Sequence, residues 1–455
     1  MNSQAKVRFI TLGCKVNQYE TQGMREVLER ARVESLTAEG KPAEVDFVVI
    51  NTCTVTEGAD RENRYWIRRA RREHPRARIV VTGCGVVRNR KQIEMLPEVD
   101  LVLSNPEKAE IANRLLGGCA DPILQDKEAG QRRHAYLPLS ISRSEGLGRA
   151  FVKVQDGCNH ACSFCKVVLV RGRSRSRGLK DILEEVRRLR DSGYKEVVFT
   201  GIQLGAYGLD FAQGEKRNLV DVLEASAKVE GIERLRLSSI EPIDVTADLI
   251  KTLASIPQCC HHLHLPLQSG DDEILKRMDR RYRSSFYTEL IARLKSVMPD
   301  FSLTLDVMAG FPGEEEEHFQ NTIGVLEKVQ PLKCHVFPYS RREGTRAARF
   351  ENVRAGVVHQ RVRRLIDLAE RIGREVRLPY IGKEISVLVE AQKKNTALLQ
   401  GLTSNYFKVS FQGAPGWVGR IVPVRLLALE GNTFLGRVIK TARESLRHSE
   451  RSEES

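Results

Sequence analysis

The sequence predicts an α/β protein with three parts: a small parallel βα domain at the amino terminus, a partial barrel of six βα units, and a small all-β barrel at the carboxyl terminus. Three observations support this prediction. A strand, a cysteine and a polar or helical segment recur three times in residues 6–112, six strands alternate with helical segments from residue 150, and only short strands follow residue 378. Alternating strands and helices are typical of parallel sheets covered by helices.

The amino-terminal domain, predicted to span residues 5–113, contains three apolar strands that each end close to a cysteine. The strands are VRFITLG, VDFVVINT and ARIVVTG, and the cysteines are Cys14, Cys53 and Cys84. The carboxyl ends of parallel strands lie along one edge of a sheet, so these three cysteines can converge. Taken alone, a free cysteine is more often a small apolar core residue.

The second domain, predicted to span residues 144–376, follows a Gly- and Pro-containing linker at 114–143. Helical segments such as DILEEVRRLRDSG are long enough to connect its parallel strands, and the chemistry of such barrels is expected at the carboxyl ends of the strands. The predicted strands are AFVKVQ (150–155), EVVFTG (196–201), RLRLSS (234–239), LHLPLQ (263–268), LTLDVM (303–308) and KCHVFP (333–338).

The third domain, predicted to span residues 377–441, has five short strands and no long helix, which is typical of a small closed barrel. The tail 442–455 has almost no apolar residues and is predicted to be disordered. The five strands are EISVLVE, ALLQGLT, YFKVSFQG, RIVPVRLLAL and TFLGRVI.

Composition narrows the class of protein. The 455 residues are 41% hydrophobic, enough for several cores, and no membrane-spanning apolar run or secretory signal is found, so a soluble cytoplasmic protein is expected. The formal net charge of +14 indicates either a polyanionic partner or a solvated basic surface. Ten cysteines are too sparse for a disulfide scaffold, and grouped reduced thiols suggest metal binding.

The most informative motif is DGCNHACSFCK, which follows the first barrel strand and contains Cys158, Cys162 and Cys165. Three thiolates can hold three irons of a [4Fe-4S] cluster. The fourth iron can then bind the amino and carboxylate groups of S-adenosylmethionine, and an electron can break its sulfonium bond to release a 5′-deoxyadenosyl radical. A structural zinc site is the alternative, but it normally needs four ligands, and no fourth ligand follows at zinc spacing. His160 is predicted to be a loop residue and Phe164 to cover the cluster.

Polar and small residues follow several barrel strands, where a cofactor is expected to lie. Glycine lets a ligand approach the backbone, while hydroxyl, amide and carboxylate groups can bind the methionyl and ribose parts of S-adenosylmethionine. Such residues are also ordinary in turns. The candidates are Thr200, Gly201, Ser238, Ser239, Glu241, Gln268, Ser269 and Asp306.

Basic residues are concentrated at 61–78, 171–177 and 341–377. A charged run is usually a solvated helix face, which is an adequate explanation for the first and third runs. The second run follows the cluster loop directly, so its arginines are predicted to surround the mouth of the active site and to bind phosphates. They are Arg171, Arg173, Arg175 and Arg177.

Several motifs in order resemble the methylthiotransferases of the radical S-adenosylmethionine (radical SAM) superfamily, and the resemblance extends to about residue 440. The motifs are TLGCKVNQYET, NTCTVT, VTGC, GCNHACSFCKVVLVRGRSRSR, TGIQLGAYG, LRLSSIEP, HLHLPLQSG, GFPGE and FPYSRREGT. The resemblance implies that Cys14, Cys53 and Cys84 bind a second [4Fe-4S] cluster. It leaves Cys119, Cys259, Cys260 and Cys334 as core residues.

The carboxyl-terminal barrel resembles the OB-like TRAM domain, which is an RNA-binding module. Small barrels of this kind hold RNA with basic and aromatic surface residues. Tyr406 and Phe407 are the aromatic candidates, although Phe407 fits the barrel core equally well.

The resemblance also implies the reaction. The phrase TLGCKVNQYET resembles the branch that adds a methylthio group to C2 of N6-threonylcarbamoyladenosine next to the tRNA anticodon. S-adenosylmethionine would act as methyl donor and radical source, with a flavodoxin or ferredoxin as electron donor and a separate sulfur source. The alternatives are the same chemistry on isopentenyladenosine in tRNA or on an aspartate of a ribosomal protein, and a non-catalytic iron-sulfur RNA-binding sensor.

Overall fold

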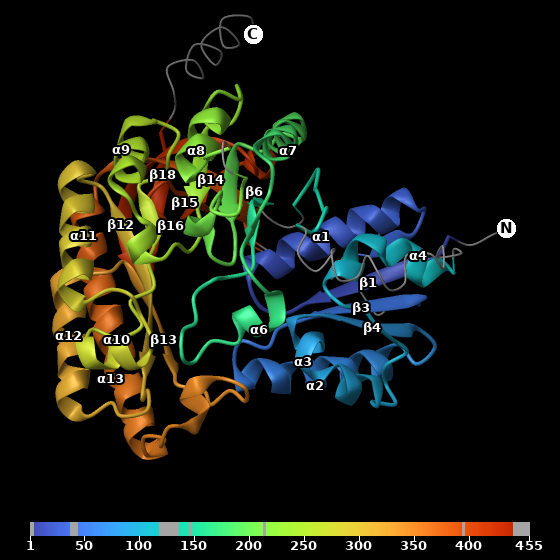
Figure 1. Cartoon of the computed structure of the whole chain (residues 1–455). Coiled ribbons are helices and arrows are strands. Elements are labelled where there is room, and N and C mark those ends of the chain that lie inside the picture. The colour runs from blue at the N-terminus through green and yellow to red at the C-terminus, as the bar shows by residue number, and fades with distance from the viewer. Residues whose placement is uncertain are drawn as a thin grey trace, which may run out of the picture.

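The computed structural model describes residues 4–36, 44–117, 136–144, 148–212, 215–393 and 396–439. The predicted tail 442–455, Cys119 and most of the predicted linker 114–143 lie outside this part of the chain. In Figure 1 the amino-terminal domain is on the right, and the six-stranded barrel is on the left. No described helix is long and apolar enough to cross a membrane.

The amino-terminal domain is a five-stranded parallel sheet in the order β2-β1-β3-β4-β5. Helices α1 and α4 cover one face, and α2 and α3 cover the other (Figure 1). The strands are β1 (Lys6–Thr11), β2 (Glu34–Leu36), β3 (Phe47–Thr52), β4 (Arg78–Gly83) and β5 (Leu101–Val102). The helices are α1 (Lys15–Arg30), α2 (Glu57–Glu73), α3 (Cys84–Glu94), η1 (Pro106–Glu110) and α4 (Ile111–Leu116).

The burial pattern of β3 shows why this sheet forms. All six of its residues are buried, because the strand is central and is covered on both faces. The three predicted apolar strands are therefore correct. The two edge strands β2 and β5 have three and two residues, too short to stand out as apolar runs in the sequence.

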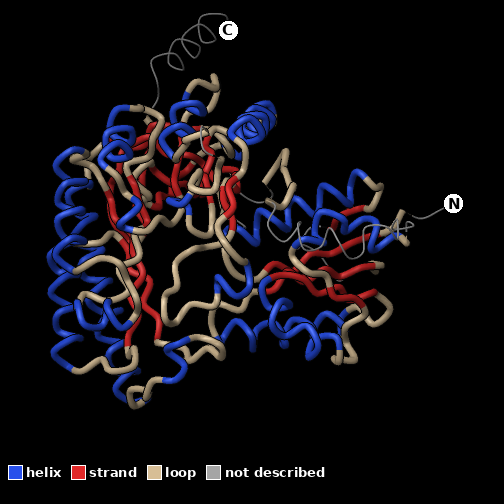
Figure 2. The backbone as a smooth tube through the Cα atoms, in the orientation of Figure 1, coloured by secondary structure: helices blue, strands red, loops and turns tan. Residues whose placement is uncertain are grey.

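The second domain is a partial parallel barrel made of two three-stranded sheets, β10-β9-β6 and β11-β12-β13. Isolated bridges at Leu235–Cys259 and Ser239–His264 connect the two sheets, and the helices lie on the outer side of this curved wall (Figure 2). All six predicted strands are confirmed: β6 (Arg149–Lys153), β9 (Glu196–Thr200), β10 (Arg234–Leu237), β11 (His262–His264), β12 (Ser302–Ala309) and β13 (Lys333–Pro338).

The remaining elements of this domain are helices and one small ribbon. The helices are α6 (Val167–Arg171), α7 (Leu179–Asp191), η3 (Leu204–Ala206), α8 (Leu219–Ala227), η4 (Pro242–Asp244), α9 (Ala247–Ser255), α10 (Asp272–Arg277), α11 (Ser284–Val297), α12 (Glu316–Val329), η5 (Arg346–Arg349) and α13 (Ala355–Arg377). The ribbon pairs β7 (Gln155–Asp156) with β8 (Arg175–Ser176) and lies beside the predicted cluster loop.

The third domain is a closed barrel in the order β14-β15-β16-β18-β17, as predicted from its short strands. Buried side chains including Phe407, Phe411 and Phe434 fill its interior. Its strands are β14 (Glu384–Gln392), β15 (Leu398–Thr403), β16 (Lys408–Gln412), β17 (Ile421–Glu430) and β18 (Thr433–Val438), with short turns at η6 (Leu378–Tyr380) and η7 (Pro415–Trp417).

Candidate active site

The predicted radical loop begins directly after β7 and ends at α6. Gly157 has φ +73°, and an added Cβ would lie only 2.0 Å from the carbonyl oxygen of Arg173, so this position requires glycine. The amide of Cys158 donates to the carbonyl oxygen of Gly172 at 3.0 Å. These contacts close the loop, and the six strands place it at the carboxyl end of the barrel.

Hydrogen-bond donors are directed at each sulfur of this loop. The amide of His160 lies 3.3 Å from Cys158 Sγ, and the amide of Val167 lies 3.4 Å from Cys165 Sγ. Arg280 Nη1 lies 3.6 Å from Cys162 Sγ. Burial raises the pKa of Cys158 to about 12 and that of Cys165 to about 11, so both thiols stay protonated without metal. Bound iron would supply the positive charge that these sulfurs need as thiolates.

Gln203, just after β9, connects the loop to the barrel. Its Oε1 accepts from the amide of Asn159 at 3.1 Å and lies 3.3 Å from Cys158 Sγ. Its Nε2 lies 2.8 Å from His160 Nε2, which therefore acts as an acceptor. This contact agrees with the prediction that His160 is a loop residue.

Cys14, Cys53 and Cys84 come together at the carboxyl edge of the amino-terminal sheet, as the parallel order predicts. Gly13 lies so close to Cys53 that an added Cβ would be 2.7 Å from its Cβ, and its φ of +94° also favours glycine. Burial raises the pKa of Cys53 to about 11, and the charges of Cys84 and Cys14 act in the same direction. Cys14 is exposed, whereas the other two thiols are buried.

Two asparagines hold the backbone around this second triad. Asn63 of α2 donates through Nδ2 to the carbonyl oxygen of Cys53 at 2.6 Å and accepts from its amide at 3.3 Å. Asn17 of α1 donates to the carbonyl oxygens of Leu12 and Thr52 at 2.8 and 3.0 Å. The ends of β1 and β3 are therefore fixed to each other and to α2.

The donor chemistry of both triads fits an iron-sulfur cluster. Cys14 is the N-cap of α1, Cys84 is the first residue of α3, and Cys165 immediately precedes the N-cap of α6. Helix amino termini stabilise thiolates. Among the described residues, no three His, Cys, Asp or Glu side chains are arranged to hold a single metal ion. A [4Fe-4S] cluster makes a different demand, because each thiolate binds its own iron.

Arg171 connects the two triads, and the prediction that it binds phosphate is wrong. It is only 5% exposed. Its Nε donates to Cys84 Sγ at 3.2 Å, while Nη1 donates to Glu20 Oε1 at 2.7 Å and to Asp156 Oδ1 at 3.1 Å. The guanidinium group therefore forms its hydrogen bonds within the interface between the first two domains. Because α6 ends at Arg171, the same short helix contacts both cysteine sites.

Glu20 is the acidic centre of this interface. Its carboxylate also accepts from Lys108 Nζ at 2.5 Å and from Lys153 Nζ at 2.8 Å. All of these side chains are almost completely buried. Burial alone would raise the pKa of Glu20, but the charges of Arg171, Lys108 and Lys153 hold this pKa well below its usual range. Glu20 therefore remains ionised between the two domains.

The other three arginines of the predicted phosphate-binding run differ in exposure. Arg177 is 6% exposed and pairs with Glu185 at 2.9 Å, so its predicted role is also wrong. Arg175 is half-buried and lies 3.7 Å from Asp156 Oδ2. Arg173 is exposed, and its contact with RNA stays a prediction. A run that looks like a basic surface in the sequence is thus mainly an internal electrostatic contact.

The two aromatic RNA-binding candidates differ in burial, since Phe407 is buried and Tyr406 is half-buried. Phe407 is 1% exposed and belongs to the core of the third domain, so its predicted surface role is wrong. The ring of Tyr406 stacks on His262 with centroids 4.3 Å apart, and the guanidinium groups of Arg149 and Arg236 lie 5.6 and 5.3 Å from its centroid. Tyr406 therefore joins the third domain to the base of the barrel, and its contact with RNA stays a prediction.

Three predicted cofactor residues lie at polar positions in the barrel. Asp306 Oδ2 is 3.1 Å from His264 Nε2, and Glu241 forms an ion pair with Arg280, the arginine that contacts the radical loop. Gln268 is 8% exposed and has a positive φ of 63°. Its buried Oε1 has no hydrogen-bond partner in the described structure. A ligand that donates a hydrogen bond would satisfy this oxygen.

The other predicted cofactor residues lie elsewhere on the same domain. Phe164 packs edge to face with Phe311, with centroids 6.4 Å apart, in a small apolar cluster. Ser269 Oγ accepts from the amide of Asp271 at 3.2 Å, next to the start of α10. The last four lie at or just after the ends of β9 and β10, and their contact with a cofactor stays a prediction: Thr200, Gly201, Ser238 and Ser239.

Sequence reasoning missed several residues that hold the site together. Gln203 lies within the quoted motif TGIQLGAYG but received no role, and Arg280 has no motif that marks it. Glu20 lies in the motif TLGCKVNQYET and Lys153 in the predicted strand AFVKVQ, but neither of them nor Lys108 received a role. Only the packing of two domains shows that they are buried together.

Comparison with known proteins gives matches over all three domains. The Radical SAM superfamily matches residues 152–326, Uncharacterized protein family UPF0004 matches residues 6–104, and the TRAM domain matches residues 379–439. A solved radical S-adenosylmethionine methyltransferase, TsrM from Kitasatospora setae, has a similar fold, with a TM-score of 0.55 at 17% identity over 76% of this chain and 77% of that chain.

Two curated relatives cover almost the whole chain. Threonylcarbamoyladenosine tRNA methylthiotransferase MtaB of Bacillus subtilis is 36% identical over 433 residues, 93% of this chain and 94% of the relative. The tRNA-2-methylthio-N(6)-dimethylallyladenosine synthase of Acetivibrio thermocellus is 33% identical over 442 residues, 94% and 90% respectively. With both cysteine triads in place, the chain belongs to the methylthiotransferase family of radical S-adenosylmethionine enzymes, which use S-adenosylmethionine and a [4Fe-4S] cluster.

Proposed function

We propose that this enzyme adds a methylthio group to C2 of N6-threonylcarbamoyladenosine at position 37 of tRNA, next to the anticodon. The relatives that carry the name of this activity reach 36% identity, while those named for dimethylallyladenosine reach 35% over a smaller share of the chain. The sequence TLGCKVNQYET around Cys14 supports the same choice.

The contact between Arg171 and Cys84 carries the mechanistic part of the proposal. Sulfur insertion requires that a radical be generated close to the group that delivers sulfur. The radical loop ends at Cys165, and the helix that follows brings Arg171 to 3.2 Å from the sulfur of Cys84. We therefore propose that Cys14, Cys53 and Cys84 hold a second [4Fe-4S] cluster beside the first.

Three sets of residues have different roles at this site. Cys158, Cys162 and Cys165 would hold a [4Fe-4S] cluster, which would supply the electron that cleaves S-adenosylmethionine. Arg280 and the amides of His160 and Val167 stabilise negative charge on the sulfurs of that loop. Glu20 and Arg171 fix the amino-terminal domain against the barrel, which keeps the second triad at a constant position.

The proposal also implies partners. An electron donor such as a flavodoxin or ferredoxin is needed because each radical event consumes an electron, and a sulfur source must restore the inserted sulfur. The proposed substrate is the anticodon stem-loop of tRNA, so we propose that the enzyme acts in the cytoplasm. The third domain, which matches the TRAM domain, supports RNA as the substrate class.

Anaerobic reconstitution with iron, sulfide, reductant and S-adenosylmethionine tests the proposal. The enzyme is incubated separately with tRNA that carries N6-threonylcarbamoyladenosine and with tRNA that carries dimethylallyladenosine. Mass spectrometry of the nucleosides should detect the methylthio product only from the first tRNA. A product only from the second would reassign the substrate. An amount of 5′-deoxyadenosine no greater than that of a Cys158→Ala control would overturn the radical mechanism.

A further inference from the structure

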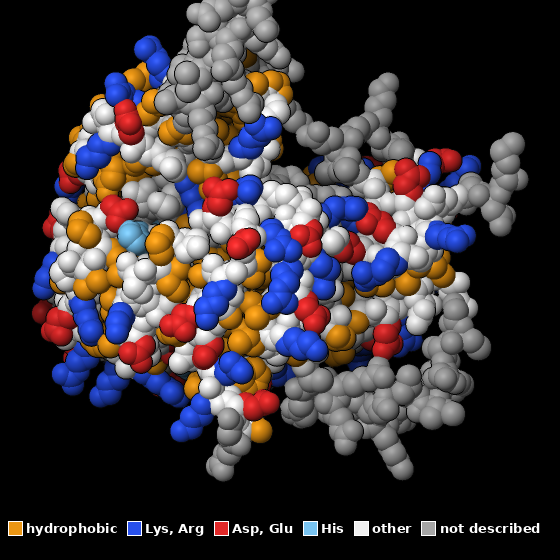
Figure 3. Space-filling view, turned by 90° about the horizontal axis from the view of Figure 1, so that it is seen from above, with side chains coloured by type: hydrophobic (Ala, Val, Ile, Leu, Met, Phe, Trp, Pro, Cys, Tyr) orange, Lys and Arg blue, Asp and Glu red, His pale blue; other side chains and the backbone are white. Residues whose placement is uncertain are grey.

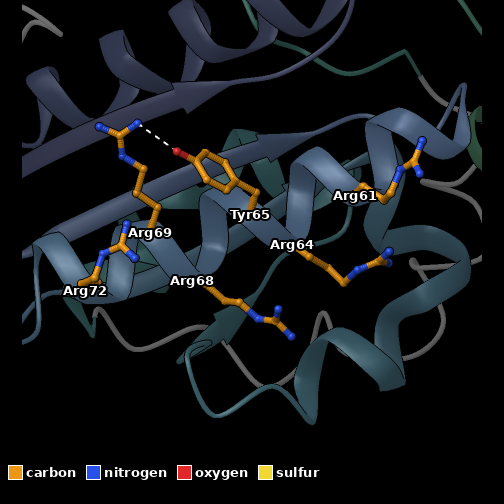
Figure 4. Close-up of a pocket in the computed structure, with 6 residues that line it drawn as sticks. All are labelled: Arg61, Arg64, Tyr65, Arg68, Arg69 and Arg72. Atoms are coloured by element: carbon orange, nitrogen blue, oxygen red, sulfur yellow. Dashed lines mark hydrogen bonds between the residues drawn. The ribbon is translucent and has the colours of Figure 1, made fainter.

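The outer face of α2 is lined by arginines that the proposed reaction does not use. Five arginines and one tyrosine from this helix surround a hollow of about 310 Å³ (Figure 4). They follow helical spacing and so share one side of α2, while Asn63, Ile67 and Ala70 are buried on the opposite side. The residues that line the hollow are Arg61, Arg64, Tyr65, Arg68, Arg69 and Arg72.

The charges of this face are largely uncompensated. No described carboxylate lies within ion-pair distance of Arg61, Arg64 or Arg72, and all three are exposed. The side chain of Arg68 is 68% exposed. Its nearest acidic partner, Glu98, lies 3.9 Å away, which is a long ion pair. Arg69 alone has a close partner, Glu73 at 2.7 Å. A surface of this kind attracts a polyanion.

The other basic runs of the chain are different. Arg171 and Arg177 are buried ion-pair residues, and in α13 the side chains of Arg361, Arg364 and Arg371 pair with glutamates of α12 or the loop before it. On the face seen from above, basic side chains lie among acidic ones (Figure 3). Along α2, by contrast, three exposed arginines without an ion-pair partner in the described structure share one face of a single helix.

The position of α2 relates this face to the cysteine site. Asn63 holds both peptide groups of Cys53, as described above. Asp60 of α2 pairs with Arg342, which follows β13 of the barrel, at 2.6 Å. The helix is thus fixed at the junction of the two domains. From Arg61 to Arg72 the helix rises about 16 Å, enough for several consecutive phosphates.

We propose that the outer face of α2 binds the phosphate backbone of the tRNA whose anticodon loop enters the active site. The guanidinium group of arginine can donate two parallel hydrogen bonds to two oxygens of one phosphate. Tyr65 packs edge to face against Trp66 but is 53% exposed, so the exposed part of its ring can contact a ribose or base. This inference rests on the proposed function for its choice of tRNA, but it concerns binding and not chemistry.

The test is a triple variant, Arg61→Gln, Arg64→Gln and Arg68→Gln, of the reconstituted enzyme. Its matched control removes the same charge from three exposed arginines on or just before α13 that have no ion-pair partner among the described residues: Arg349→Gln, Arg363→Gln and Arg374→Gln. Affinity for tRNA is measured by fluorescence anisotropy at several salt concentrations. We expect the α2 variant to bind at least tenfold more weakly and the slope of log affinity against log salt to fall by about 2–3, whereas the control changes little.

Two outcomes overturn the inference. Equal losses in both triple variants would mean that only total charge matters. Unchanged tRNA affinity with slower reduction by flavodoxin, but not by dithionite, would assign the face to an acidic electron-donor protein. If the triple variant unfolds, the double variant Arg64→Gln/Arg72→Gln replaces it, since neither side chain has a partner in the described structure. A wild-type enzyme that binds tRNA through α2 without forming the methylthio product would contradict the proposed function alone.

Discussion

The two cysteine triads are built in different ways. Cys158, Cys162 and Cys165 lie in one short loop, and backbone amides of that loop donate to two of their sulfurs. The amino-terminal cysteines come from three separate strand ends, and the nearest donor to Cys84 Sγ is Arg171 from the other domain. The radical site is therefore organised mainly by local contacts, while the second site depends on how two domains pack together.

This difference has a consequence for stability. Changes at the domain interface should disturb the second triad and leave the first intact, because the first triad is anchored to its own loop and to Gln203 and Arg280 of its own barrel. Four tests examine the two triads and the domain interface between them.

The largest effect is expected from replacing a ligand in each triad. Cys158→Ala should reduce 5′-deoxyadenosine formation to background, because the radical cluster loses a ligand. Cys14→Ala should leave cleavage of S-adenosylmethionine within a few-fold of wild type and abolish the methylthio product. Both activities are measured in the same anaerobic assay by liquid chromatography and mass spectrometry. Loss of cleavage in both variants would show that the triads are not independent.

The second test concerns Glu20, whose carboxylate binds three cations and is completely buried. Breaking a buried ion network by removing one partner typically costs about 3–5 kcal/mol, since charges are left uncompensated. We expect Glu20→Gln to lower the urea midpoint of the cluster-free protein accordingly. Glu29→Gln on the same helix is the control, because its pair with Arg143 is partly exposed and worth about 1 kcal/mol or less. Equal midpoints for the two variants would contradict this role of Glu20.

Much of the molecule follows from its sequence, and the rest depends on contacts between distant residues. The alternation of short strand-like segments with helical segments predicted all six barrel strands, and a compact motif predicted the radical loop. The predicted roles of Arg171 and Arg177 are wrong because charge does not reveal burial at an interface, and the sequence left Phe407 open between RNA contact and barrel core. Gln203 and Arg280 meet the loop across 45 and 118 residues, and no local periodicity encodes such contacts.

The pH dependence of unfolding gives a third test. The folded pKa of Glu20 is depressed, so its contribution to stability is present above the unfolded glutamate pKa of about 4.3 and is lost as pH falls toward the folded pKa. In that window unfolding takes up one additional proton, which corresponds to about 1.4 kcal/mol per pH unit. Urea unfolding of the cluster-free protein from pH 6 to pH 3 should show a slope that is smaller by this amount in Glu20→Gln. Parallel curves would contradict the assignment.

The smallest effect is expected from the arginines that contact sulfur. Hydrogen bonds to ligand sulfurs raise the reduction potential of an iron-sulfur cluster, because they stabilise the additional electron. Arg171→Lys keeps the positive charge but removes the Nε donor at 3.2 Å from Cys84, so the second cluster should become harder to reduce. The potential is measured by electron paramagnetic resonance titration in a background in which Cys158, Cys162 and Cys165 are alanine.

Arg280→Lys, measured in a background that lacks the amino-terminal cysteines, is the matched comparison. It should shift the radical cluster less, because its contact with Cys162 is longer, at 3.6 Å, and weaker. A larger shift for Arg280→Lys would mean that the radical site, and not the second site, relies more on its arginine.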